Sequence, residues 1–345
     1  MRQFEHISLI VAFLIVALCA TILASAHLGT IPVPIMGTVN SILGVLGLPS
    51  MTSASLTPDQ EIVLWYIRMP RILVGLLVGI ALAASGAVLQ GMFSNPLADP
   101  SILGVSAGAS LGAVVAIATG FSAASLLTLP ALAFAGAMLS VGCTVCLTVQ
   151  HGRIQPSMLL LAGVALSILL SACTSGILTF INEYQIRDFL FWMVGSLDNR
   201  QWIHVEIGLG PILLGTAILW TLARHLNVLS LGDIEAKSLG MPVMVYRLVF
   251  LIVTSLITAT AVCISGAIGF VGLIVPHMIR LLTGPDHRAL IPISALAGGF
   301  FLIFCDMLGR IIIAPEEIRV GIMTALIGAP YFLWLLRRLE RHGER

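Results

Sequence analysis

Long apolar runs alternate with short polar segments along almost the whole chain. Crossing a bilayer as a helix takes about 20 predominantly apolar residues, and most runs approach that length. The runs are continuous and lack the apolar–polar alternation of a membrane β-barrel. The pattern therefore predicts ten membrane helices, at roughly 7–26, 72–91, 102–118, 123–149, 157–181, 203–224, 243–263, 268–283, 290–312 and 320–336.

Two polar stretches and one uncharged loop lie between these runs. The segment Ser94–Pro100 carries two prolines and two turn formers, so it predicts a tight turn between helices. Between 182 and 202, charged residues precede a short apolar stretch, and we expect a short extra helix at the surface. No Lys or Arg lies between His27 and Gln60, which is typical of a long translocated loop.

The composition excludes an ordinary soluble domain. Of the 345 residues, 58% are hydrophobic and 10% are charged, whereas about a quarter of a soluble domain is charged. We interpret the chain as one all-α polytopic membrane domain over residues 1–345. The net charge of +1 argues against a nucleic-acid partner. With both termini in the cytoplasm, the inside receives most of the 17 Lys and Arg residues, as the positive-inside rule expects.

The small residues, cysteines and histidines favour structural roles over chemical ones. Gly104, Gly108 and Gly112 recur every four positions, and such a face lets membrane helices approach closely. The six cysteines all lie in apolar runs, and we expect small core residues. Cys143 and Cys146 form a single Cys-x-x-Cys without a second pair, which is weak evidence for a metal. No two of the eight histidines are spaced to ligate one metal or haem from a single helix.

Several ordered motifs resemble one family of membrane proteins. They are Arg68-Met-Pro-Arg71, Ser85-Gly-Ala-Val-Leu-Gln90, Asn95-Pro-Leu-Ala-Asp-Pro100 and Leu103-Gly-Val-Ser-Ala-Gly-Ala109, followed later by 266–277, 284–288 and 324–330. Together they resemble the permease subunits of type II ABC importers for iron–siderophore complexes, haem and cobalamin. The resemblance covers nearly the whole chain from about Trp65 onward.

The resemblance implies a fold, partners and a cargo. It implies a multi-pass permease of the bacterial inner membrane that forms a homodimer, contacts lipid, and binds two cytoplasmic ATPase subunits and one periplasmic substrate-binding protein. The implied cargo is an iron chelate, either a ferric siderophore or haem. Cobalamin and small oxyanions are alternatives, because similar permeases carry them.

The polar segment 227–242 is the candidate contact with the ATPase. Asp233 is a candidate N-cap, Gly240 can end a helix in the left-handed conformation, and Pro242 prevents its continuation. A two-turn helix, amphipathic through Ile234 and Leu239, is therefore predicted; it could also be an interfacial helix that binds nothing. The sequence of this segment resembles the coupling helices by which these permeases contact their ATPase. The resemblance implies a coupling role for Leu231, Gly232, Asp233, Ile234, Glu235, Ala236, Lys237, Ser238, Leu239 and Gly240.

The sequence offers no catalytic machinery of its own. A phosphate-binding loop needs Gly-Lys-Ser/Thr, and the sole lysine, Lys237, follows an alanine. An HExxH motif is also missing from the sequence. We therefore expect no enzyme activity and no cofactor in this chain, with ATP and Mg bound by the partner ATPase.

Arginines at the expected outer side have two interpretations. Arg68, Arg71 and Arg310 could snorkel at the interface or form a basic docking patch; the resemblance matches them to arginines that receive acidic residues of the binding protein. Asp306 lies four residues before Arg310, which predicts an ion pair within one helix. An intramembrane carboxylate can also be a proton relay, as in an ion-coupled secondary transporter, the rival interpretation. Arg319 stands where the resemblance leads us to expect proline.

The run 157–181 resembles the pathway-lining helix of the family. Its hydroxyl residues Ser167, Ser171, Thr174 and Ser175 would give a mildly polar face to a passing cargo. Pro156 and Ser157, at the start of this run, match the loop that forms the cytoplasmic gate in the cobalamin importer, where the resemblance leads us to expect small hydroxyl residues.

Overall fold

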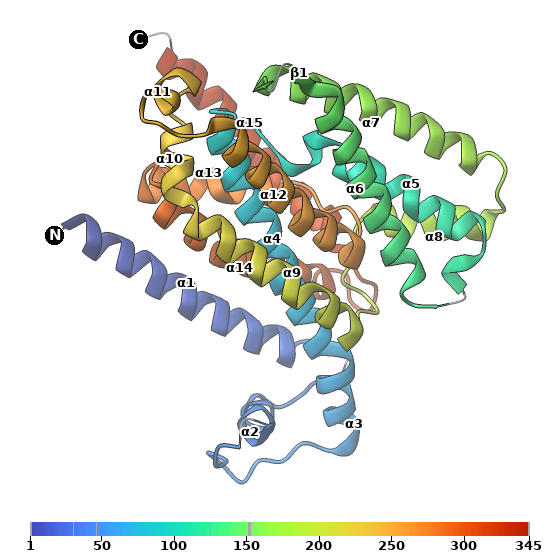
Figure 1. The fold of residues 1–345 in the computed structure, drawn as a ribbon. Coiled ribbons are helices and arrows are strands. Elements are labelled where there is room, and N and C mark those ends of the chain that lie inside the picture. Colours follow the sequence, from blue (N-terminus) through green and yellow to red (C-terminus); the bar gives the residue numbers. More distant parts are fainter. Residues whose placement is uncertain (1, 30, 46, 124, 151–152, 344–345) are drawn as a thin grey trace.

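The computed structural model describes residues 2–29, 31–45, 47–123, 125–150 and 153–343, and the described chain forms a bundle of helices (Figure 1). Seven helical segments are long and apolar enough to cross a membrane, and several shorter apolar helices accompany them. The predicted all-α polytopic fold is confirmed. The predicted runs correspond to α1 (Arg2–His27), α4 (Met69–Met92), α5 (Val105–Ala118), α6 (Thr128–Thr148), α7 (Pro156–Leu178), α9 (Trp202–Thr221), α12 (Val243–Ser265), α13 (Val271–Thr283), α14 (His287–Ile311) and α15 (Val320–Gly343).

Short elements connect these helices. The expected extra helix between 182 and 202 is α8, which Asn182 caps by accepting a hydrogen bond from the backbone of Gln185 at 3.0 Å. The loop after α1 contains a helix that the sequence analysis did not predict, α2. The short elements are α2 (Ile35–Val45), α3 (Pro58–Ile62), the π-helical turn η1 (Val63–Arg68), the 3₁₀ turns η2 (Pro100–Leu103) and η3 (Phe121–Ala123), α8 (Glu183–Met193), α10 (Ala223–Leu229), α11 (Asp233–Ser238), and the antiparallel strands β1 (Val149–Gln150) and β2 (Arg153–Ile154).

The centre of the bundle is a helical segment that starts earlier than predicted. α3, η1 and α4 run without interruption over the 35 residues Pro58–Met92, whereas the sequence placed the start near residue 72. Thr57 and Gln60 form a capping box at its beginning, so the polar residues there mark a helix start rather than a loop. The most apolar part of the segment is 83% buried, because α9, α12, α13 and α14 pack around it.

Glycines bring the central helices into close contact. A Cβ atom added to Gly79 of α4 would lie 2.2 Å from the carbonyl oxygen of Gly298 in α14. On α5, Cβ atoms at Gly108 and Gly112 would lie 2.3 Å and 2.0 Å from backbone oxygens of α6. Gly104 differs, because it adopts a left-handed conformation (φ 85°) as the residue just before α5. The small-residue face of α5 therefore packs on α6, and Gly104 serves the turn before it.

The outer helices expose much of their surface. Only 17% of the most apolar part of α7 is buried within the chain, and its packing neighbours include α5 and α6 on one side. This exposure corrects the expectation for the cysteines: Cys263 and Cys305 are buried, whereas the other four are exposed. An apolar run in a membrane protein can face lipid or another subunit as well as a core, so apolar surroundings in sequence did not imply burial.

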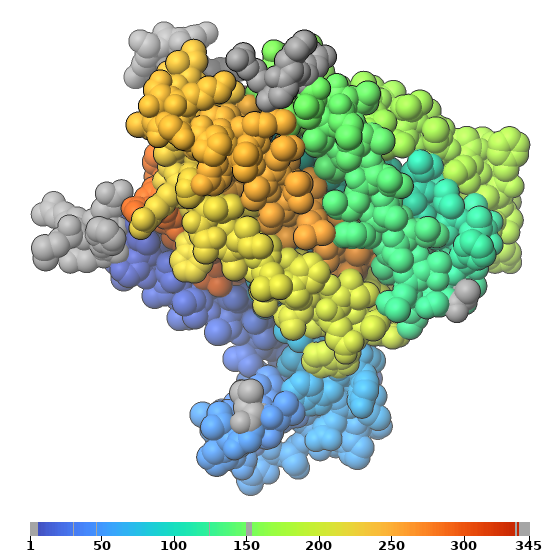
Figure 2. All heavy atoms as spheres, viewed as in Figure 1, coloured from blue at the N-terminus to red at the C-terminus, as the bar shows by residue number. Residues whose placement is uncertain are grey.

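The bundle has two distinct ends. The start of α1, the end of α15, α10 and α11 lie at one end, whereas α2 and α3 lie at the other (Figure 1). The α2–α3 region stands out from the rest of the surface as a separate projection, coloured light blue in Figure 2. α11, which belongs to the candidate contact with the ATPase, therefore lies at the opposite end of the molecule from α2 and α3.

Candidate functional site

The segment between α9 and α12 presents an apolar surface to solvent. Leu231, Ile234 and Leu239 are 62%, 77% and 67% exposed, while Ala236 is buried against the bundle. Exposed apolar groups gathered on a short polar element mark a contact surface more often than a free one. The predicted helix is present as α11, and Gly240 has the predicted left-handed conformation (φ 77°).

Asp233 does not cap α11, which corrects the sequence prediction. Gly232 occupies the N-cap position, and the first helical residue is Asp233. The Asp233 carboxylate instead accepts hydrogen bonds from Arg247 of α12, at 2.6 Å to Oδ1 and 3.2 Å to Oδ2. Its side chain fixes the position of α11 against α12 rather than closing the helix end.

Arg247 joins three segments. Its guanidinium is buried, and besides Asp233 it donates to the backbone carbonyl of Ile154 at 2.7 Å. Ile154 belongs to β2, two residues before Pro156 at the start of α7. This role of Arg247 was not predicted from the sequence. An arginine within an apolar helix nevertheless indicates a partner elsewhere in the chain, since a buried charge requires one.

The proposed gate residues lie at the first turn of α7. Pro156 is the first residue of the helix, where its missing N–H leaves no broken hydrogen bond. Ser157 follows it and is exposed. Both residues therefore follow closely after Ile154, whose carbonyl oxygen accepts the hydrogen bond from Arg247.

The four hydroxyl residues of α7 do not share one environment. Ser171 and Ser175 are exposed, four residues apart on one face, and Ser167 continues that line. Thr174 is buried and donates to the carbonyl oxygen of Leu170 at 2.9 Å. The polar stripe on the uncovered face is thus narrower than predicted and excludes Thr174.

The outer arginines are buried, which corrects the expectation of an exposed patch. Arg68, Arg71 and Arg310 are only 5%, 8% and 8% exposed. Arg68 donates to the carbonyl oxygens of Ala26, His27 and Ile31. They are buried because each guanidinium faces another part of the chain: Arg68 faces the backbone at the end of α1 and after it, and Arg71 and Arg310 face the Asp306 carboxylate.

Asp306 is the shared partner of two of these arginines. Arg71 Nη2 lies 2.9 Å from Asp306 Oδ1, and Arg71 Nη1 lies 2.8 Å from Glu317 Oε2. Arg310 Nε lies 3.3 Å from Asp306 Oδ2, so the predicted ion pair within α14 is confirmed. The carboxylate is 3% exposed and doubly paired, a structural network rather than the unpaired acid that a proton relay requires.

Arg319 connects the start of α15 to α8. Its guanidinium lies 4.1 Å from the ring centre of Phe191 and donates to the Phe191 carbonyl at 3.2 Å. In the same region, burial lowers the pKa of Arg200 to about 10, because the Asp198 carboxylate offsets only part of that effect. Arg200 still carries its charge at neutral pH. Arg319, which stands where the resemblance leads us to expect proline, therefore joins the start of α15 to α8.

Metal-ligating residues do not gather in the described part of the chain. Among those residues, no group of three or more His, Cys, Asp or Glu side chains is placed to hold a metal ion.

Comparisons with known proteins identify the family. The model of the FecCD transport family matches residues 10–338. A cobalamin import system permease of Halobacterium salinarum is 44% identical over 324 residues, covering 92% of this chain and 85% of that protein. A hemin transport system permease of Yersinia pestis is 40% identical, covering 97% and 98%.

A solved structure agrees with these sequence matches. The inward-facing conformation of an ABC transporter assigned to the metal-chelate type superimposes with a TM-score of 0.83 at 33% identity, covering 96% of this chain and 99% of that one. The chain belongs to the FecCD transport family and has the fold of an ABC importer permease.

Proposed function

We propose that this permease is the homodimeric translocation subunit of an ATP-driven importer of iron chelates in the bacterial inner membrane, with both termini in the cytoplasm. Two ATPase subunits would bind at the α11 end and supply ATP and Mg²⁺, and one substrate-binding protein would dock at the α2–α3 end. The observation that carries the proposal is α11, which exposes Ile234 and Leu239 while Asp233 ties it to Arg247.

In the proposed mechanism, the α11 contact couples motion of the ATPase to the start of α7. A motion of the ATPase against the exposed apolar residues of α11 would reach Arg247 through its ion pair, and Ile154 through the hydrogen bond beyond it. Since Ile154 precedes the gate residues Pro156 and Ser157, the same motion would move the start of α7. The pathway would lie between the two uncovered α7 helices of the dimer, where Ser171 and Ser175 offer a polar stripe that does not bind cargo tightly.

A co-purification experiment tests the assignment of α11. The double variant Ile234→Glu/Leu239→Glu places two charges on the proposed contact, so tagged permease should retain much less of its cognate ATPase. Met51→Glu is the control, because Met51 is 74% exposed and lies in the loop between α2 and α3, away from α11. ATPase recovery equal to that of the control would overturn the assignment, provided that the double variant purifies as a folded, monodisperse protein.

The proposed docking site for the binding protein is not a patch of exposed arginines. Arg68, Arg71 and Arg310 are held inside the subunit, so they would act beneath the docking surface by organising exposed groups such as Glu317. Charge at such a surface mainly sets orientation and encounter rate. We therefore propose that the binding protein meets the surface above this network rather than the guanidinium groups themselves.

An iron chelate, as a ferric siderophore or haem, is the proposed cargo. The 40% identity to a hemin transport permease supports it, and the 44% identity to a cobalamin permease favours cobalamin as the second candidate. Isolating the cognate binding protein with its native ligand tests both, through the absorption spectrum and metal content. Iron supports the proposal, and cobalt would replace it with the second candidate.

A further inference from the structure

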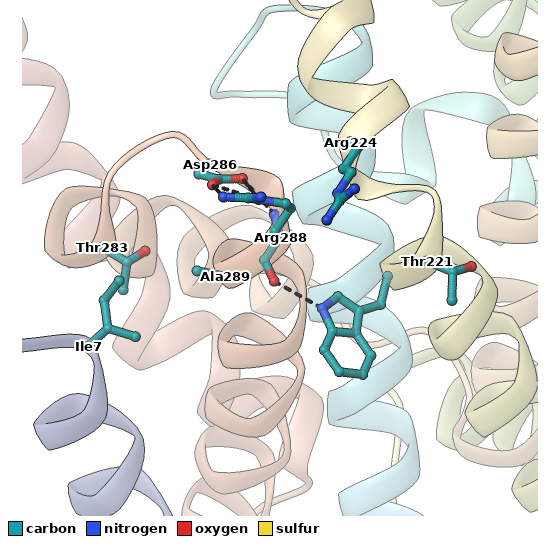
Figure 3. A pocket seen from close by; sticks show the side chains of 8 residues that line it. Ile7, Thr221, Arg224, Thr283, Asp286, Arg288 and Ala289 are labelled. Carbon is teal, nitrogen blue, oxygen red and sulfur yellow. Dashed lines mark hydrogen bonds and ion pairs between the residues drawn. The ribbon is translucent and has the colours of Figure 1, made fainter. Parts of the chain in front are cut away.

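A cavity lies where α9, α13 and α14 meet near the start of α1. Its volume is about 580 Å³, and Trp220, Arg224, Asp286 and Arg288 are among its lining residues, with Ile7 on the α1 side. In Figure 3 the Arg224 guanidinium points toward the region of Arg288, whose backbone carbonyl accepts the hydrogen bond from Trp220. None of these residues belongs to the coupling, gate or pathway surfaces described above.

The cavity carries one uncompensated positive charge. Arg288 pairs with Asp286 at 3.0 Å, and Asp286 also accepts a hydrogen bond from Asn227 at 2.8 Å. Burial raises the pKa of Asp286, but the hydrogen bonds from Asn227 and Arg288 outweigh it and leave the pKa below its usual value. Arg224 is exposed and has no hydrogen-bond or ion-pair partner among the described residues. Two arginines and one aspartate thus leave a net charge of +1, located on Arg224.

The cavity lies at the level where three membrane helices end. The apolar spans His6–His27, Trp202–Thr221 and His287–Ile311 each begin or end beside it. Trp220 donates from Nε1 to the carbonyl oxygen of Arg288 at 2.9 Å, and tryptophan is typical of the membrane–water boundary. Leu281 and Leu282 near the end of α13 are 62% and 52% exposed, so the protein surface close to this level is apolar.

We propose that this cavity binds the phosphodiester headgroup of an anionic phospholipid, with Arg224 as the principal charge contact and Ile7 and Trp220 against the start of the acyl chains. Basic pockets between helices at the membrane boundary have the chemistry for such headgroups. A zwitterionic lipid is disfavoured, because Asp286, the one carboxylate among the described lining residues, already has partners. A soluble phosphate shares the anionic group but lacks the acyl chains that the apolar wall accommodates.

Native mass spectrometry of the detergent-solubilised full chain tests the site. Phosphatidylglycerol should bind more tightly than phosphatidylcholine, and Arg224→Gln should weaken phosphatidylglycerol binding about fivefold, the effect expected of one arginine near a membrane surface. Arg224→Lys, which retains the charge, should keep most of the affinity. Arg337→Gln is the control, since Arg337 is an exposed arginine outside the cavity.

A second variant separates binding from folding. Thr221→Phe narrows the cavity without changing its charge and should also reduce phosphatidylglycerol binding, while the midpoint of thermal unfolding in detergent should stay near that of the wild type. Equal affinity of wild type and Arg224→Gln would overturn the proposal, as would equal binding of the two lipids. Displacement of phosphatidylglycerol by inorganic phosphate would also overturn it, because the site would then be one for soluble anions.

Discussion

Asp233 and Arg247 join α11 to α12 at 2.6 Å, and Arg247 carries the connection on to Ile154 before α7. α11 is thereby attached to the segment just before α7, the helix proposed to line the pathway. Contiguous hydrogen bonds and ion pairs of this kind can carry energetic coupling between two sites. Here they join the proposed ATPase contact to the proposed gate.

Breaking this connection should uncouple ATP hydrolysis from transport. Arg247→Gln removes the charge that Asp233 binds, so cargo taken up per ATP should fall about fivefold or more, the usual range of coupling between sites. The measurement is uptake and ATP hydrolysis by the reconstituted importer. Arg337→Gln, the same substitution at an exposed arginine outside the link, is the control. An unchanged ratio in Arg247→Gln would remove this route from the mechanism.

Cysteine accessibility should distinguish the two sides of α7. In a background with the native cysteines replaced, Ser171→Cys and Ser175→Cys should react with a water-soluble thiol reagent in at least one nucleotide state, because both residues are exposed. Thr174→Cys should react far more slowly, since Thr174 is buried. Labelling rates in the assembled importer provide the measurement, and inert cysteines at 171 and 175 in every state would contradict the pathway assignment.

Replacing Asp306 should destabilise the fold. Asp306→Asn leaves Arg71 and Arg310 without their shared buried partner, at a cost of about 3–5 kcal/mol. Glu317→Gln removes a partly exposed partner of Arg71 and should cost about 1 kcal/mol or less. Thermal unfolding and the yield of monodisperse protein measure both. A stable Asp306→Asn protein whose uptake had lost its dependence on pH would instead favour the proton-relay interpretation.

Gly112 and Gly142 form a matched pair for helix packing. Gly112→Ala forces a Cβ against the backbone oxygen of Leu132, which would be 2.0 Å away, and should destabilise by about 1–3 kcal/mol. At Gly142 nothing lies within 4 Å of an added Cβ, so Gly142→Ala should be neutral or stabilise by about 0.5–1 kcal/mol. Unfolding midpoints in detergent provide the comparison. Equal midpoints would show that α5 and α6 are not held at this separation.

The Asp286 interactions should make stability fall in acid. Because the folded pKa lies below the unfolded value of 3.8, the contribution is complete above that value and is lost as the pH falls through the folded pKa. The unfolding midpoint of the wild type should therefore approach that of Asp286→Asn at low pH, while the difference stays constant above about pH 5. A difference that grows as the pH falls would contradict this assignment.

The length and continuity of the apolar runs predicted the helices well, because a helix that crosses the hydrocarbon needs both. The start of the central segment was missed, since Asp59 and Glu61 look like loop residues although they are favourable at a helix N-terminus. The burial of Arg68 and Arg71 could not be predicted, because it depends on partners far away in the sequence, in the segments 26–31 and 306–317.

Side-chain partners were less predictable than helices. The ion pair between Asp306 and Arg310 is local, four residues apart, and could be read from spacing. The pairs of Arg71 with Asp306 and of Arg247 with Ile154 join distant parts of the chain, so no spacing rule identifies them. Burial of Thr174 likewise depends on how α7 is rotated, which small differences in packing decide.

The uninterrupted helix Pro58–Met92 has a mechanical consequence. At about 1.5 Å per residue, 35 residues extend for roughly 50 Å, whereas the hydrocarbon layer is about 30 Å thick. The segment is therefore longer than the hydrocarbon layer is thick, and its first residues, α3, lie at the end of the molecule that also carries α2 (Figure 1). In the proposed importer, a binding protein that docks at this end would meet the start of the same helix around which α9, α12, α13 and α14 pack.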